Sequence, residues 1–134
     1  MNEQDTGPVR EDDAATHSVR AELSREMVRL YKDLFGRGPT MARTDFAGPD
    51  ILICTLEDSF TPAERALVAM GEHQRLRDTR QYFQYATEDR FCGVVERVLD
   101  RKVRAFVSGV DTKKDVSSEL FYLDGPSGSS SNGL

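Results

Sequence analysis

The sequence has few of the residues from which metal centres and disulfide frameworks are built. Its 134 residues include two cysteines, Cys54 and Cys92, and two histidines, His17 and His73. Both cysteines have apolar neighbours, among which a reduced cysteine packs as a small hydrophobic residue. The four positions show no spacing typical of a structural zinc site. We therefore expect no metal, no cofactor and no secreted disulfide scaffold.

Long apolar runs and an excess of positive charge are also missing. The longest apolar run, Ala66 to Met70, is far shorter than the roughly 20 residues of a membrane-spanning helix. The 23 acidic side chains outnumber the 18 basic ones and give a net charge of −5, which disfavours a protein that neutralises nucleic-acid phosphates. The first residues are acidic and polar, unlike a signal or transit peptide. We predict a cytoplasmic protein that associates with a membrane only through a partner.

Composition divides the chain into a body and two tails. Residues 1–16 are acidic and carry too few apolar side chains to offset the entropy of ordering, so we predict a disordered N-terminal tail. Residues 125–134 have the Gly/Ser composition of a flexible linker and are also predicted to be disordered. Residues 17–124 show no internal repeat and suit one domain with a single core.

The body begins with a helical pattern. Apolar residues recur at helical spacing from Val19 to Leu34, which predicts an amphipathic helix. Thr16 or Ser18 can cap its start, and Gly36 is a typical helix stop.

Thr61, Pro62 and Glu64 form the clearest local signal. The Thr61 hydroxyl can accept a hydrogen bond from the backbone N–H of Glu64, whose carboxylate can accept one from the N–H of Thr61. Pro62 suits the first helical position, where its missing N–H costs nothing. A helix is therefore predicted to start here, and a longer helical pattern follows from Leu76 to Leu99.

Four segments have strand character: Thr40–Phe46, Ile51–Leu56, Val103–Val107 and Ser118–Leu123. The second of these is apolar on both faces, which indicates a central strand. The order of elements, α-ββ-αα-ββ, predicts a two-layer α+β fold. Its four-stranded antiparallel sheet would consist of two hairpins, with helices packed on one face.

Several blocks carry a family resemblance. In order, they are Leu34–Pro39, Leu56–Glu57 with Phe60–Glu64, Val95–Glu96 with Lys102–Val103, Phe106–Asp111 and Phe121–Leu123. Together they resemble the MpsC-like family, a component of a sodium-translocating, membrane-potential-generating system, over most of the body. The resemblance implies a link to membrane systems that handle cations and inorganic carbon. It defines no catalytic residues, so none is assigned.

These observations favour a non-enzymatic, soluble accessory or regulatory protein of a membrane cation or inorganic-carbon transport system. Its expected partners are a second copy of itself and a membrane transporter subunit. One alternative is a small-anion sensor. A nucleic-acid-binding regulator is a further alternative, which the net charge disfavours.

Five arginines are candidate anion ligands: Arg37, Arg43, Arg75, Arg77 and Arg80. The planar fork of donors on a guanidinium suits phosphate, bicarbonate or a carboxylate. Arg37 is notable because it lies between two glycines in a tight turn. The alternative is that Gly36 merely caps the helix and that these arginines are solvated charges paired with acidic neighbours.

Tyr82, Phe83 and Tyr85 form an aromatic segment within the longer helical pattern. On one helix these three side chains cannot all point the same way, so a single sheet face cannot cover all of them. We predict that they belong to an interface, such as that of a homodimer. The alternative is ordinary core packing against the sheet.

Overall fold

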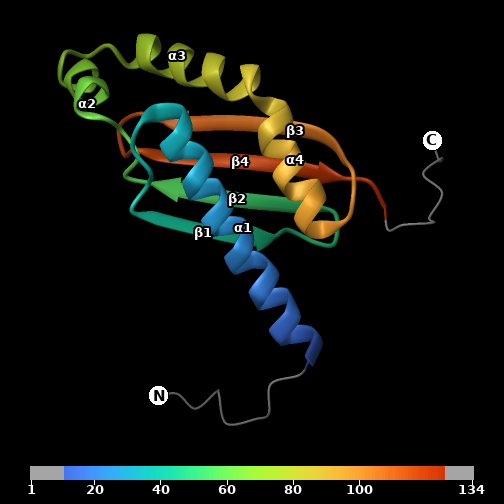
Figure 1. Cartoon of the computed structure of the whole chain (residues 1–134). Helices are drawn as coiled ribbons and strands as arrows, with labels where there is room; N and C mark the ends of the chain where they lie inside the picture. The colour runs from blue at the N-terminus through green and yellow to red at the C-terminus, as the bar shows by residue number, and fades with distance from the viewer. Residues whose placement is uncertain (1–10, 126–134) are drawn as a thin grey trace, which may run out of the picture.

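The computed structural model describes residues 11–125, which form a two-layer α+β domain (Figure 1). The elements are α1 (Glu11–Phe35), β1 (Met41–Phe46), β2 (Ile51–Glu57), α2 (Pro62–Ala69), α3 (His73–Ala86), α4 (Glu88–Leu99), β3 (Val103–Asp111) and β4 (Val116–Leu123). The predicted fold class and order of elements are confirmed. The helical stretch between the two hairpins contains three helices.

All neighbouring strands of the sheet are antiparallel, and their order is β1-β2-β4-β3. Strand β2 is central, as its apolar character on both faces predicted. The second hairpin is longer than predicted, because β3 continues to Asp111 and β4 already begins at Val116. A shift in register between Val103 and Ala105 separates the core-facing start of β3 from the rest of the strand.

Helix α1 corrects the predicted boundary of the N-terminal tail. It begins at Glu11, so the segment up to Thr16 is helical although residues 14–18 are exposed. Lack of burial does not prevent this, because extending an existing helix avoids the cost of nucleating a new one. Residues 1–10 and 126–134, which make up the rest of the two predicted tails, lie outside the described residues. The helix ends at Phe35, and Gly36 follows in the left-handed conformation with φ 79°, as predicted.

The predicted capping box at the start of α2 is present. Thr61 caps the helix with its hydroxyl, the Glu64 carboxylate accepts from the Thr61 N–H, and Pro62 is the first helical residue. The longer helical pattern is divided at Thr87 into α3 and α4. The Thr87 hydroxyl donates to the carbonyl of Phe83 at 2.7 Å, and such a bond to the preceding turn competes with regular helix geometry.

The hydrophobic core lies between the helices and one face of the sheet. Its fully buried members include Leu23, Met27, Phe91 and Val95 from the helices and Leu52, Leu56 and Phe121 from the sheet. Figure 1 shows α1 and α4 crossing this face, with α3 running alongside at the β3 edge. Cys54 is buried in the core, Cys92 is half-buried, and both thiols are free.

Alternate residues of the strands point to the opposite face of the sheet, which carries no helix of the described residues. In β2 and β4 every second residue is buried, and the residues between them are partly exposed. We call the second set, with its neighbours on β1 and β3, the open face of the sheet. Within residues 11–125, the open face and the outer side of α3 are not covered by another helix or strand.

Candidate functional site

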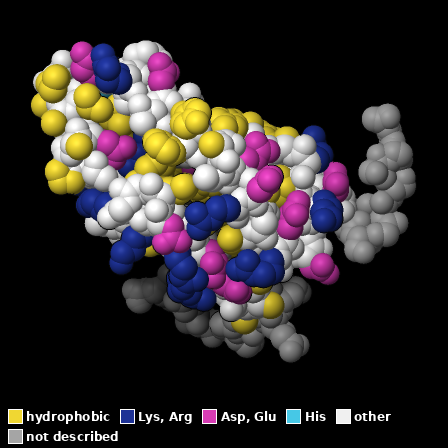
Figure 2. All heavy atoms as spheres, turned by 45° about the horizontal axis from the view of Figure 1, so that its top comes forward, with side chains coloured by type: hydrophobic (Ala, Val, Ile, Leu, Met, Phe, Trp, Pro, Cys, Tyr) yellow, Lys and Arg dark blue, Asp and Glu magenta, His cyan; other side chains and the backbone are white. Residues whose placement is uncertain are grey.

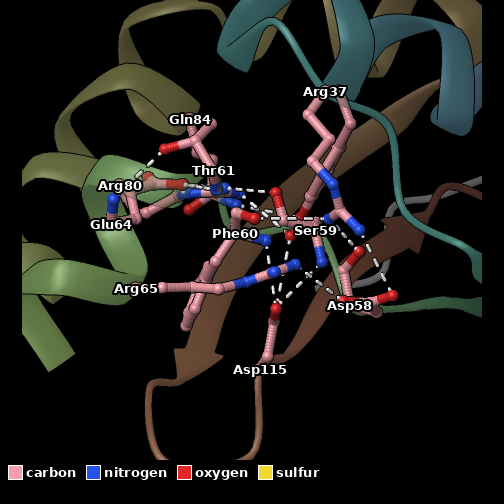
Figure 3. Close-up of polar contacts among 11 residues, drawn as sticks. Arg37, Asp58, Ser59, Phe60, Thr61, Glu64, Arg65, Arg80, Gln84 and Asp115 are labelled. Atoms are coloured by element: carbon pink, nitrogen blue, oxygen red, sulfur yellow. Dashed lines mark hydrogen bonds and ion pairs between the residues drawn. The ribbon is translucent and has the colours of Figure 1, made fainter. Parts of the chain in front are cut away.

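The junction between β2 and α2 is held by side chains from distant parts of the chain (Figure 3). Arg37, which follows α1, donates to the backbone carbonyls of Asp58 and Phe60, and its guanidinium lies 3.3 Å from the Asp58 carboxylate. From the turn between β3 and β4, the Asp115 carboxylate accepts the backbone N–H groups of Ser59 and Phe60, each at 3.0 Å. The junction is therefore fixed from both sides.

Arg80 of α3 makes the innermost contacts at this junction. Its side chain is completely buried and forms a two-pronged ion pair with Glu64, with Nε–Oε2 and Nη2–Oε1 distances of 2.7 and 2.6 Å. It also donates to the Ser59 carbonyl and hydroxyl, and its guanidinium lies 3.7 Å from the ring centre of Phe35. Burial raises the pKa of Glu64, but the hydrogen bonds from Arg80 and Thr61 outweigh it and hold that pKa below its ordinary value.

One helical turn further along α3, Gln84 belongs to a second buried polar cluster, with Tyr31 and Glu119. The Tyr31 hydroxyl donates to Glu119 Oε2 at 2.5 Å, and Gln84 Nε2 lies 2.8 Å from the same oxygen. Gln84 Nε2 is also 3.0 Å from the Tyr31 oxygen. All three side chains have no exposed surface. A glutamate thus lies inside the core with an amide and a phenol as its donors.

Part of this cluster has unused hydrogen-bonding capacity. Within residues 11–125, the second carboxylate oxygen of Glu119 and the side-chain carbonyl of Gln84 are buried without a hydrogen-bond partner. The same holds for the hydroxyls of Ser108 and Ser117. Ser108 is the cross-strand neighbour of Glu119, and Ser117 lies two residues before it on the same face. The cluster therefore has room to rearrange its hydrogen bonds around a proton on Glu119.

The environment shifts the ionisation of Glu119 toward its neutral form. Burial raises the pKa of its carboxyl to about 7, even though the neighbouring side chains of Ser108, Tyr31 and Gln84 lower it. The pKa of Tyr31 is raised well above its ordinary value, first by burial and then by the charge of Glu119. Chemically, this cluster can hold and release one proton near neutral pH. Across the described part of the chain, no group of three or more His, Cys, Asp or Glu side chains is placed to hold a metal ion.

The five arginines predicted as anion ligands are not brought together. Arg37 and Arg80 donate to groups within the chain, as described above. Arg43 is on β1, whereas α3 packs against β3 at the opposite edge of the sheet. The Arg43 guanidinium lies 2.9 Å from the Asp45 carboxylate. Arg75 is 3.4 Å from the Glu72 carboxylate, and Arg77 donates to Gln74 at 3.2 Å. Anion binding by any of these side chains stays a prediction.

Of the three aromatic residues predicted as an interface, Tyr82 and Phe83 lie at the surface of α3, whereas the Tyr85 ring packs edge-on against Phe106 of β3. The exposed fractions are 70% for Tyr82, 43% for Phe83 and 41% for Tyr85. The Phe83 ring packs edge-on against Tyr82 and Phe35, and Tyr85 accepts the backbone N–H of Ser108 at 2.8 Å. Figure 2 shows hydrophobic side chains gathered along this side of the molecule. We call Tyr82, Phe83 and Tyr85 the α3 aromatic surface.

Sequence reasoning missed the two buried polar clusters. Glu119 occupies the same face of β4 as Phe121 and Leu123, so strand alternation alone places it toward the core. Arg80 and Gln84 are four residues apart with Leu76 one turn before them, a spacing that assigns all three to one helix face. The signal was therefore present as periodicity, but polar side chains on an apolar face were not interpreted as buried.

Comparison with known proteins identifies the family. Residues 15–125 match the sequence model of the family described as "Na+-translocating membrane potential-generating system (MpsC)". A curated relative, "Uncharacterized protein YbcI" of Bacillus subtilis (strain 168), is 23% identical over 107 residues, which cover 79% of this chain and 86% of the relative. No solved structure matches the chain. Since the family match spans most of the chain and includes both buried clusters and the α3 aromatic surface, the chain belongs to the MpsC family.

Proposed function

We propose that this protein is a non-enzymatic accessory or regulatory subunit of a membrane system that moves cations, and that it docks on a membrane-embedded partner through the α3 aromatic surface. The family description names a sodium-translocating system that generates membrane potential. Among the helices of residues 11–125, none combines the length and apolar character needed to cross a membrane. On this proposal, a partner provides the contact with the bilayer.

The observation that carries the proposal is the exposure of aromatic rings on a rigid helix. Tyr82 is 70% exposed and Phe83 43% exposed. Covering such a ring with a partner removes apolar surface from water, which is favourable. Aromatic side chains of this kind are enriched in the centres of protein interfaces, where few residues supply most of the binding energy.

The other side of α3 explains why these rings are presented in a fixed position. Arg80 and Gln84, which are fully buried, tie α3 to the β2–α2 junction and to the core cluster. Because these bonds fix the rotation of the helix about its own axis, Tyr82 on the opposite side and the adjacent Phe83 stay at the surface. A preorganised surface binds with a smaller loss of conformational entropy.

Photo-cross-linking from the proposed surface tests the docking. A photoreactive amino acid replaces Tyr82 in the protein expressed in its own cells, and a matched control places it at Glu22, which is exposed on α1. We expect an adduct with an integral membrane transport protein from position 82 and none from position 22. Adducts at position 82 that contain only this chain would contradict the docking proposal.

A functional assay tests the role itself. In a strain that lacks the gene, a potential-sensitive dye reports the sodium-dependent membrane potential. We expect the wild-type gene and a Thr79→Ala control on the same helix to restore the potential, and the double variant Tyr82→Ser/Phe83→Ser not to restore it. Equal restoration by all three would refute a role for these rings, and an unchanged potential in the deletion strain would refute the proposed function.

A small-anion sensor is a second candidate, because Arg77 reaches Thr112, which two lysines follow in the chain. Arg77 of α3 lies 3.5 Å from the Thr112 hydroxyl, and Lys113 and Lys114 follow in the exposed turn. A saturable rise in melting temperature with bicarbonate or phosphate, lost in Arg77→Ala, would support this function. A melting temperature that does not respond to either anion would refute it.

A further inference from the structure

The open face of the sheet has an apolar centre. In register, Ile53 pairs with Leu120 and Ile51 pairs with Tyr122, so four apolar side chains adjoin one another on β2 and β4. Val107 extends the patch onto β3, opposite Leu120, and is 45% exposed. An antiparallel sheet that faces water on one side normally alternates apolar residues inward with polar residues outward. This sheet departs from that pattern at the centre of its open face.

We propose that the open face is the interface of a symmetric dimer with a second copy of this chain. A two-fold axis that runs parallel to the strands, between β2 and β4, lays β2 of one copy over β4 of the other and β1 over β3. This arrangement places Ile53 against the partner's Leu120 and Ile51 against the partner's Tyr122. The apolar centre is then buried against itself, in the manner of aligned sheets that pack face to face.

The charges at the two edges of the face support a second copy as the occupant. Strand alternation places Arg43 and Asp45 of β1 and Asp111 of β3 on the side of the open face, and Arg104 lies over the Tyr122 ring on that face. The Asp45 carboxylate, at the sheet edge, also lies 2.9 Å from Arg43 and 3.6 Å from Arg20 of α1. With β1 over β3, the register sets Asp45 opposite the partner's Val107 and Arg43 opposite the partner's Gly109. Of the partner's two edge charges, Arg104 is then the nearer to Asp45 and Asp111 the nearer to Arg43, each offset by two or three residues along the strand. The same axis therefore makes positive and negative charges alternate along both edges while it aligns the apolar centre. Such complementarity selects partner and orientation more than it adds affinity.

The size of the face predicts how strongly the dimer holds. Four strands spaced about 4.8 Å apart, each contributing about seven residues at about 3.3 Å per residue, give a footprint of roughly 450 Å². Two such footprints approach the roughly 1,000 Å² at which specific interfaces begin. We therefore expect a dimer that dissociates on dilution rather than an obligate one.

Sedimentation analysis of the full chain over a concentration series gives the first test. We expect the average mass to rise from that of a monomer to that of a dimer. A Leu120→Asp variant should remain a monomer at every concentration, whereas Tyr82→Ser/Phe83→Ser should dimerise like the wild type. A wild-type chain that stays monomeric throughout overturns the proposal. A dimer that survives Leu120→Asp and is lost in the α3 variant overturns it too, since it places the interface on the other side of the molecule.

A charge exchange provides the decisive test and does not depend on how well Leu120→Asp folds. Arg104→Asp and Asp45→Arg each replace attraction by repulsion at two symmetric contacts, and we expect each to raise the dissociation constant of the dimer about tenfold. The double variant restores attraction and should return the constant to near the wild-type value. Within one chain the two residues lie on opposite edges of the sheet, about 14 Å apart, too far for a direct pair. Recovery of the dissociation constant in the double variant can therefore arise only from contacts between copies. A double variant whose dissociation constant rises by the combined effect of the two single variants would overturn the proposed orientation.

Discussion

The buried carboxyl of Glu119 leads to the sharpest prediction for stability. Its pKa is about 7 in the folded protein and near the ordinary value of 4.5 when the chain is unfolded and the side chain is hydrated. Between these two values the folded protein keeps its proton while the unfolded chain has released it. Because the unfolded state then binds fewer protons, the free energy of unfolding falls as the pH rises through this window.

The size of the effect follows from the interval between the two pKa values. Since one pKa unit corresponds to about 1.4 kcal/mol, Glu119 should lower the stability of the wild type by about 3 kcal/mol between pH 4.5 and pH 7. Below this window both states are protonated, and above it both are ionised, so the contribution is constant on either side. Replacement of Glu119 by glutamine removes the titration and retains an oxygen that accepts from Tyr31 and Gln84. The new amide N–H groups can be accepted by Ser108 or Ser117, whose hydroxyls lack partners.

Urea unfolding at a series of pH values, followed by circular dichroism, measures this contribution. The stability of Glu119→Gln minus that of the wild type should increase by about 3 kcal/mol from pH 4.5 to 7 and change little above pH 7. The subtraction cancels the titration of every other group. Glu22→Gln, on the exposed side of α1, is the matched control and should show no such increase. A difference for Glu119→Gln that is independent of pH would show that this carboxyl titrates alike in both states and would refute the reasoning.

Three further predictions concern the junction and the cysteines. Arg80→Met should lower the free energy of unfolding by about 3 kcal/mol in urea titrations, because it leaves the half-buried Glu64 carboxylate without its partner. A loss below about 1 kcal/mol would contradict this. Thr61→Ala should cost about 1 kcal/mol in the same assay, because it removes the cap of α2, and an unchanged stability would show that the cap contributes nothing. Cys92 should react with a thiol reagent before Cys54, because burial raises the pKa of the Cys54 thiol to about 12 and makes it less accessible. Mass spectrometry after brief treatment measures the order of reaction, and the reverse order would refute this.

The secondary structure of this protein could be predicted because its signals are local. The capping box depends on residues three positions apart, and the stop of α1 depends on a single glycine, Gly36. The first hairpin follows from two short apolar and polar runs separated by a turn. The division of the long helix at Thr87 was harder to predict, since a threonine hydroxyl bonded to the preceding turn leaves the hydrophobic period intact.

The buried clusters could not be assembled from the sequence because their partners are distant in the chain. Glu64 and Arg80 are separated by 16 positions and lie on different helices, and Tyr31 and Glu119 are separated by 88. Periodicity assigns each residue to a face but does not say which residues of that face meet. Arg80 was interpreted as a solvated charge or an anion ligand because arginines on helices are usually exposed, whereas here Glu64 and Ser59 occupy its donors.

The two proposed surfaces do not compete, because they lie on opposite layers of the molecule. The α3 aromatic surface belongs to the helical layer, and the open face belongs to the sheet. A dimer formed through the sheets would therefore display two α3 aromatic surfaces, each directed away from the two-fold axis. Two linked docking surfaces bind a membrane partner present in several copies more tightly than one, without any new contact. Arg104→Asp should then weaken association with membranes that contain the partner although it leaves Tyr82 and Phe83 unchanged, and Asp45→Arg in the same chain should restore it. If association with such membranes is unaffected by dimerisation, the two surfaces act independently, and docking requires only the single chain.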